Sequence, residues 1–133
     1  MKKINRCQSL VREAFAGNTI IQNDLIRISK EDYEKMETSF PKAVSVRIDG
    51  NFSLAEQLQQ LANTVCEEVH FTIKTFILSI EYGTDEPLDI EEVNSVHNFM
   101  YAYQTGNIEG IYNVGENSAL PCQRAVEIFL FGI

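Results

Sequence analysis

The sequence predicts an α+β fold, a two-layer sandwich in which a mixed four-stranded sheet carries helices packed on one face. Two helical patterns with apolar stripes alternate with strand-like segments, and two further strand-like segments end the chain. No internal repeat, low-complexity tract or linker divides the 133 residues. A chain of this length can bury a sizeable core, so residues 1–133 are expected to form a single domain.

The first 40 residues begin with a helical pattern. Residues 1–17 are predicted to form a leading helix, because apolar residues recur at helical spacing from Ile4 to Phe15 and Gly17 follows as a stop. Residues 20–28 read as an extended or looped segment. Ser29 then stands where a side chain can cap a helical turn over residues 29–37.

The four strands are predicted by alternation and by β-branched and aromatic residues. They cover residues 43–49, 73–82, 108–114 and 124–133. In the first, Val44, Val46 and Ile48 alternate with polar residues, which indicates a half-buried strand.

Two helices are expected between these strands. The first begins at Ser53-Leu-Ala-Glu56, which has the spacing of a capping box, and carries an apolar stripe. The second spans residues 90–104. Its inner stripe is expected to comprise Ile90, Val93, Val96 or His97, Met100 and Tyr103.

An acidic cluster precedes the second helix, and it could be a metal site, an acid/base pair or a helix start. It consists of Asp85, Glu86, Asp89, Glu91 and Glu92. Asp89 and Glu92 have capping-box spacing, and acidic residues in a first turn favour the helix dipole. The alternating ligands of a calcium loop are absent. Helix capping is therefore the expected role, and no metal ligands are assigned.

Charge and motifs exclude several classes of function. The net charge of -8 argues against nucleic acid or an anionic membrane as a partner. Neither the dinucleotide-binding glycine pattern nor the P-loop pattern occurs, so no cofactor is expected. The three cysteines are widely spaced without a CxxC, which is typical of reduced, mostly buried thiols. With no apolar leader or span, a cytoplasmic location is expected.

A catalytic or ligand-binding alternative remains open at this point. Tyr82, His97, Tyr101 and Glu127 are its candidate residues, at a site between subunits of an oligomer, because Glu127 is a charge within an apolar run. The competing interpretation is that Glu127 faces solvent on its strand and that His97 lies at the edge of the core.

The second half of the chain resembles the C-terminal domain of the bacterial tubulin homologue FtsZ. The strand "TFILSIEYG" leads through a turn to "LDIEEVNSV", where Leu88, Ile90, Glu92, Val93 and Asn94 match the family's helix opening, with Asp89 in the position of a threonine. "AVEIFLFGI" resembles the family's closing strand. "KAVSVRIDGNFSLAEQLQQLANTV" resembles its earlier strand, turn and helix, and "SLVREAFAGNTIIQNDLIRISKEDYEKM" resembles the end of its central helix and the following loop.

The resemblance implies a protein-interaction or assembly domain rather than an enzyme. The family's nucleotide-binding domain is missing, and in the loop that assists GTP hydrolysis Arg27 replaces an asparagine, Ser29 replaces the first aspartate, and only Asp32 is kept. Self-association or binding to a tubulin-like polymer is implied, with a place in cell division. The expected contact residues are Asn23, Asp24, Arg27 and Asp32. The third possibility is a fragment of a larger GTPase, although Met1 followed by a helical pattern favours a complete chain.

Overall fold

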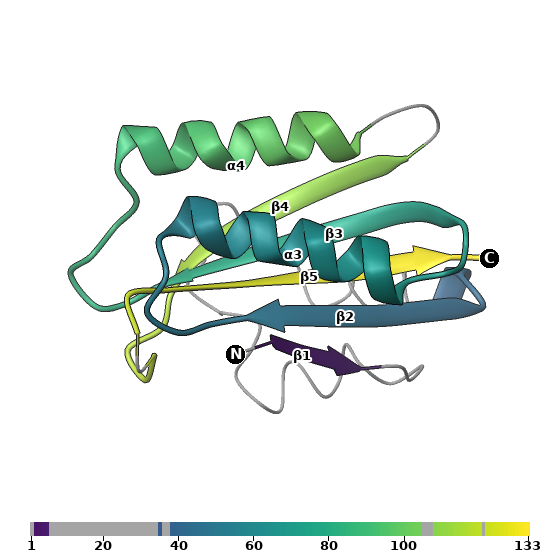
Figure 1. Cartoon of the computed structure of the whole chain (residues 1–133), viewed down its shortest axis with the longest axis horizontal. Coiled ribbons are helices and arrows are strands. Elements are labelled where there is room, and N and C mark those ends of the chain that lie inside the picture. The colour runs from purple at the N-terminus through teal and green to yellow at the C-terminus, as the bar shows by residue number, and fades with distance from the viewer. Residues whose placement is uncertain (1, 6–34, 36–37, 105–107, 121) are drawn as a thin grey trace.

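The computed structural model describes residues 2–5, 35, 38–104, 108–120 and 122–133. In these ranges a five-stranded sheet carries two helices on one face (Figure 1). The elements are β1 (Lys2–Asn5), β2 (Lys42–Ile48), α3 (Leu54–Glu68), β3 (Ile73–Tyr82), α4 (Ile90–Tyr103), β4 (Glu109–Glu116) and β5 (Arg124–Gly132). The predicted class, an α+β two-layer sandwich with a mixed sheet, is confirmed.

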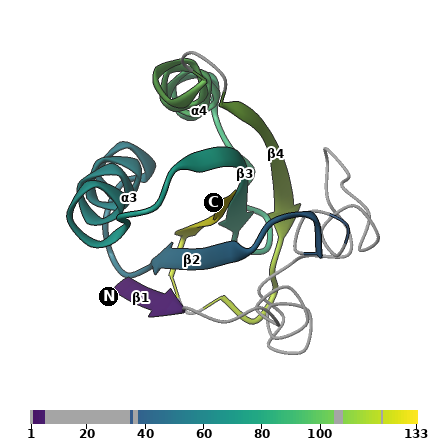
Figure 2. The ribbon, with the colours of Figure 1, turned by 90° about the vertical axis from the view of Figure 1, so that its right-hand side faces the viewer.

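The strand order explains why both helices lie on the same face. The sheet runs β1-β2-β5-β3-β4, with β3 and β4 parallel and the other neighbours antiparallel. The crossovers β2-α3-β3 and β3-α4-β4 therefore step across the sheet in the same direction. Right-handed crossovers in one direction place their helices on one face, as Figure 2 shows. The last strand, β5, is inserted between β2 and β3.

The predicted leading helix over residues 1–17 is wrong where the structure describes it. Lys2–Asn5 form β1, which pairs antiparallel with β2 and places Lys3 opposite Arg47. β5 occupies only one edge of β2, so the other edge can bond this segment, and backbone pairing there overrides a weak helical spacing. The sheet gains a fifth strand beyond the four predicted. The rest of the prediction lies outside the described residues, as does most of the expected turn at 29–37.

The main core fills the space between the sheet and the helices. From the sheet come the alternating side chains of β2, β3 and β5, including the predicted set Val44, Val46 and Ile48. From α3 comes the predicted apolar stripe: Leu54, Leu58, Leu61 and Val65 are each at most 4% exposed, and Ala62 and Val69 are partly buried against the core. Neither helix described here is long and apolar enough to cross a membrane.

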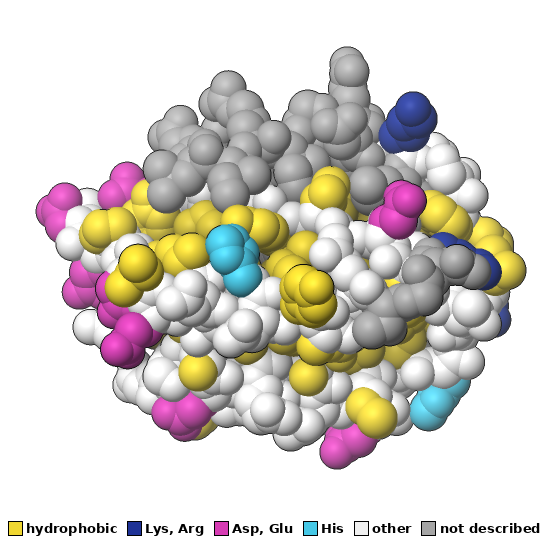
Figure 3. Space-filling view, turned by 90° about the horizontal axis from the view of Figure 1, so that it is seen from above, with side chains coloured by type: hydrophobic (Ala, Val, Ile, Leu, Met, Phe, Trp, Pro, Cys, Tyr) yellow, Lys and Arg dark blue, Asp and Glu magenta, His cyan; other side chains and the backbone are white. Residues whose placement is uncertain are grey.

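The inner stripe of α4 differs from the prediction at its first residue. Val96, Phe99 and Met100 are buried as the inner face, but Ile90 is 77% exposed. Glu92 is directed toward the sheet, where it pairs with Arg124, and a residue two positions earlier on a helix lies roughly 200° away. Ile90 therefore lies on the outer face of α4. Figure 3 looks onto the molecule from the α4 side, where hydrophobic side chains lie in the open among acidic ones.

One glycine is required by close packing between strands. Gly110 in β4 stands directly opposite Phe76 in β3, and a Cβ atom at Gly110 would collide with the Phe76 ring. Phe76 is fully buried, and Tyr103 packs edge-on against it with 5.7 Å between ring centroids. Covering a strand glycine with an aromatic ring joins β3, β4 and the end of α4.

Candidate functional site

The acidic segment before α4 is explained by its own backbone. Asp89 Oδ1 accepts a hydrogen bond from the backbone N–H of Glu92 at 2.8 Å, and Glu92 Oε1 accepts from the backbone N–H of Asp89 at 3.1 Å. The predicted capping box is confirmed. The preceding turn closes when the N–H of Glu86 donates to the carbonyl of Gly83 at 3.0 Å, with Asp85 at a φ of 61°. Aspartate tolerates that left-handed conformation better than most residues.

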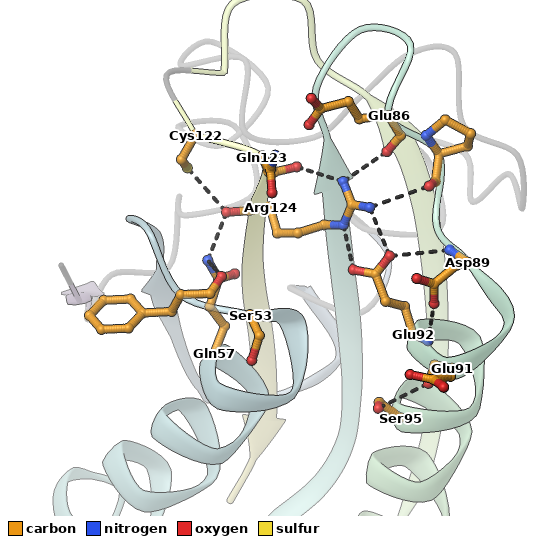
Figure 4. Close-up of polar contacts among 12 residues, drawn as sticks. Ser53, Gln57, Glu86, Asp89, Glu91, Glu92, Ser95, Cys122, Gln123 and Arg124 are labelled. Atoms are coloured by element: carbon orange, nitrogen blue, oxygen red, sulfur yellow. Dashed lines mark hydrogen bonds and ion pairs between the residues drawn. The ribbon is translucent and has the colours of Figure 1, made fainter.

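Arg124 of β5 ties this segment to the sheet (Figure 4). Its Nε and Nη2 donate to the two carboxylate oxygens of Glu92 at 2.7 and 2.8 Å, a bidentate pair. Its Nη1 donates to the carbonyls of Glu86 and Gln123, both at 2.8 Å, and Nη2 reaches the carbonyl of Pro87 at 3.3 Å. The hydrogen bonds to Arg124, with the bond to Asp89 assisting, hold the pKa of Glu92 below its usual range even though burial opposes this. The ion pair of Arg124 with Glu92 and the hydrogen bonds of Arg124 to the turn carbonyls therefore join α4, the preceding turn and β5.

The N-cap of α3 follows the prediction in part. Ser53 Oγ accepts from the N–H of Glu56 at 3.1 Å, but the Glu56 carboxylate accepts from the Ser53 hydroxyl instead of its backbone N–H. Behind this cap, Gln57 is fully buried and donates through Nε2 to the carbonyl of Arg124 at 2.8 Å (Figure 4). The start of α3 and the start of β5 are joined in this way.

A second cluster of charges lies on the sheet face opposite the helices. The strand registers place four polar residues in one row across four strands: Arg47 opposite Glu127, Glu127 opposite Ser79, and Ser79 opposite Asn113. Glu81 lies two residues along β3 on the same face. We call Arg47, Ser79, Glu81, Asn113 and Glu127 the polar row. Its neighbours on this face include the buried side chains of Ile77, Ala125, Phe129 and Phe131.

Ser79, Glu81, Asn113 and Glu127 of the polar row are buried, and the half-buried Arg47 joins its two carboxylates. Arg47 Nη1 donates to Glu81 Oε2 and lies 3.5 Å from Glu127 Oε1. Asn117 Nδ2 donates to the other oxygen of Glu81 at 2.7 Å. Glu81 is 0% and Glu127 3% exposed, and the Oγ of Ser79 is buried without a hydrogen-bond partner. A single guanidinium therefore serves two buried carboxylates.

This environment changes the proton affinity of Glu127. Burial raises the pKa of Glu127 to about 7; the nearby charge of Glu81 adds to this effect, while Arg47 and Ser45 oppose it. Burial also works against the charge on Arg47, but the attraction and hydrogen bond of Glu81 outweigh it and raise the pKa of Arg47. A carboxyl group that titrates near neutrality can hold or release a proton under physiological conditions.

The structure does not bring the predicted catalytic residues together. Glu127 is on the face opposite the helices and is buried, so the interpretation that it faces solvent is wrong. Tyr82 is 8% exposed in the core between the sheet and the helices, and Tyr101 is 85% exposed on α4. His97 is exposed and its Nε2 lies 3.0 Å from the hydroxyl of Tyr112. Within the described ranges no group of three or more His, Cys, Asp or Glu residues could hold a metal ion.

Two other predictions concern cysteines and contact residues. Cys66 is exposed and Cys122 is half-buried, so the expectation of mostly buried thiols is wrong for both, and Cys7 lies outside the described residues. Asn23, Asp24, Arg27 and Asp32 also lie outside them.

Sequence reasoning missed three exposed hydrophobic side chains, two on α4 and one on β4. Ile90, Tyr101 and Ile111 are 77%, 85% and 39% exposed. His97 and Tyr112 connect α4 to β4, with 5.8 Å between ring centroids. Ile90 and Tyr101 are eleven residues apart, about three helical turns, so they lie on the same outer side of α4, with the polar Asn94 and His97 between them.

The comparisons with known proteins agree with the fold-level likeness. No protein-family model matches the chain, and no curated protein matches it by sequence. A mutant form of FtsZ from M. jannaschii is similar in structure with a TM-score of 0.66 and 15% identity, over 94% of this chain and 40% of that one. A protofilament of TubZ from Bacillus thuringiensis serovar israelensis, in the GTPγS form, gives 0.59 and 13%, over 93% and 34%. A FtsZ dimer from M. jannaschii gives 0.55 and 12%, over 85% and 33%.

These likenesses establish a tubulin-like fold and nothing finer. The chain spans 40% or less of the length of these three structures. At such identities only the course of the backbone is shared. The resemblance to FtsZ predicted from the sequence is confirmed at the level of the fold.

Proposed function

We propose that this chain is a non-enzymatic protein-interaction domain that assembles with itself or binds a tubulin-like polymer. The observation that supports this most directly is the fold, which matches part of FtsZ and part of TubZ. One matched FtsZ structure is a dimer and the matched TubZ structure is a protofilament. A domain of this fold can present to a polymer the same kind of surface that a polymer subunit presents.

The main ion pairs stabilise the fold, so recognition of a partner would depend on other, exposed side chains. Arg124 forms an ion pair with Glu92, and Arg47 forms one with Glu81; each pair joins two different elements of the fold. Side chains that bind each other in this way stabilise strands and turns. The exposed hydrophobic side chains Ile90, Tyr101 and Ile111 offer apolar contact area of the kind that partner proteins bury.

Co-sedimentation with a polymer tests the proposal. The purified chain at micromolar concentration would be mixed with FtsZ from its own source, with and without GTP, and centrifuged. We expect the chain to pellet with the polymer, or to change the amount of polymer that pellets. Sedimentation velocity of the chain alone would measure self-association.

Matched variants identify the face that binds. Arg27→Ala and Asp32→Ala remove side chains of the predicted contact loop, and Glu67→Gln removes an exposed charge on α3 as a control. A chain that stays in the supernatant, leaves the polymer unchanged and sediments as a monomer would contradict the proposal.

A further inference from the structure

Ser79 lies in the middle of the polar row and its hydroxyl is unpaired. Its side chain lies on the sheet face opposite the helices, because Leu78 and Ile80 on either side of it belong to the core beneath the helices. The residue is 1% exposed, and its Oγ has no hydrogen-bond partner within the described residues. Leaving a buried hydroxyl unpaired costs free energy. A small polar molecule bound beside Ser79 would remove that cost.

Polar side chains flank Ser79 on both neighbouring strands. The registers place Glu127 of β5 opposite it on one side and Asn113 of β4 opposite it on the other, and both are at most 3% exposed. The carboxyl of Glu127 is hydrogen-bonded to Ser45 of β2, so it leans toward β2 and away from Ser79. The amide of an asparagine can both donate and accept, so Asn113 can bond a further group whatever else it contacts. The three side chains therefore present donors and acceptors to one place on the sheet.

The spacing of these side chains matches one water molecule. Neighbouring strands lie about 4.8 Å apart, and a water bonded to two oxygens at about 2.8 Å each holds those oxygens about 4.5 Å apart. Ser79 has the shortest side chain of the three, so a molecule above its Oγ lies between the longer side chains of Glu127 and Asn113. Buried waters typically make about three hydrogen bonds to such groups. A metal ion fits less well, because the strand carbonyls bond to neighbouring strands and the described ranges contain no group of three or more His, Cys, Asp or Glu that could hold one.

We propose that the polar row binds one buried water molecule beside Ser79. The Ser79 hydroxyl donates to the water, and the water donates to the Glu127 carboxylate and to the side-chain oxygen of Asn113. Through this water the ionic contacts of Arg47, Glu81 and Glu127 extend to β4, so that one hydrogen-bonded network crosses β2, β5, β3 and β4. The site lies in the interior and is independent of the binding of a partner.

The variant Ser79→Ala distinguishes a hydroxyl that is bonded to water from one that is unpaired. If the hydroxyl is bonded to water, the variant loses that bond and leaves the water with fewer partners, so the urea midpoint should fall by about 0.5 M. If the hydroxyl is unpaired, its removal relieves a cost and the midpoint should rise. Ser118→Ala, in an exposed turn, is the matched control and should leave the midpoint unchanged. An unchanged or higher midpoint for Ser79→Ala would overturn the proposal.

A high-resolution crystal structure of the full chain identifies the bound species. We expect a density peak within about 3.2 Å of Ser79 Oγ and of a polar atom of Glu127 or Asn113, and the loss of this peak in crystals of Ser79→Ala. A hydrogen bond made directly from Ser79 to either neighbour, with no peak between them, would overturn the proposal. An anomalous peak at this place in crystals soaked in rubidium chloride would also overturn it, because the occupant would then be a monovalent cation. If Ser79→Ala does not fold, the density in the wild-type crystal decides.

Discussion

Replacing the buried carboxyl of Glu127 with an amide should make the protein less sensitive to pH. Glu127 lies 3.5 Å from Arg47, which it shares with Glu81, and it is 3% exposed. Glutamine has the shape of the protonated acid and never ionises. The variant Glu127→Gln therefore isolates the cost of the buried charge.

The magnitude follows from the difference between the folded and unfolded states. Burial raises the pKa of Glu127 from 4.5 to about 7 in the folded protein. The folded state thus holds the proton more tightly, so the associated stability is full below pH 4.5 and is lost as the pH rises to about 7. At about 1.4 kcal/mol per pH unit, the loss amounts to about 3 kcal/mol. Glu127→Gln should equal the wild type near pH 4.5 and exceed it by about this amount at pH 8.

Urea unfolding at intervals from pH 4.5 to 8 measures this difference. Comparing the two proteins at each pH cancels the titration of the carboxylates that they share. Glu67→Gln removes one exposed carboxylate from α3 and is the matched control. A difference between Glu127→Gln and wild type that stays constant across this range would refute the reasoning, because Glu127 would then be ionised in the fold at every pH tested.

Three further substitutions test contacts that hold the fold. Arg124→Met should lower the free energy of unfolding by about 2–4 kcal/mol, because Glu92 and the turn carbonyls lose their donor; Arg124→Lys should recover only part of this in urea unfolding, since it cannot form the bidentate pair. Asp89→Ala should cost about 1 kcal/mol by the same assay, and an unchanged midpoint would mean that the cap contributes nothing. Gly110→Ala should lower the thermal midpoint, with about 1–3 kcal/mol lost, because its methyl group meets the Phe76 ring. Adding Phe76→Leu to that variant should restore part of the loss if the collision is its cause.

Local patterns in the sequence were sufficient for most of the elements. The predicted strand 73–82 coincides with β3, and the second helix, predicted for 90–104, is found at Ile90–Tyr103. The capping box at Asp89 depends on residues three apart, and the strands depend on period-two alternation. Both signals are complete within a few residues of the chain.

The charged contacts could not be predicted because they join distant parts of the chain. Arg47 and Glu127 are 80 residues apart, and Arg124 and Glu92 are 32 apart. Pairing them requires the strand order and register, which the sequence does not state. The burial of Glu127 did have a signal: the run around it is apolar at both odd and even positions, which is typical of a strand buried on both faces.

The polar row adds information that the apolar alternation lacks. Alternation decides which face of a strand is buried, but a slip of two residues keeps every side chain on its face. Such a slip of β5 against β2 would move Glu127 from Arg47 to a place opposite Ser45 or Asp49, leaving a buried carboxylate without its cation. Breaking a buried ion pair costs about 3–5 kcal/mol while the carboxylate stays ionised, so this penalty applies at pH values above the pKa of Glu127, about 7. We infer that Arg47 and Glu127 select one register for the strand that enters the sheet last in sequence. The charges of Arg47 and Glu127 are then explained by the selection of one strand register.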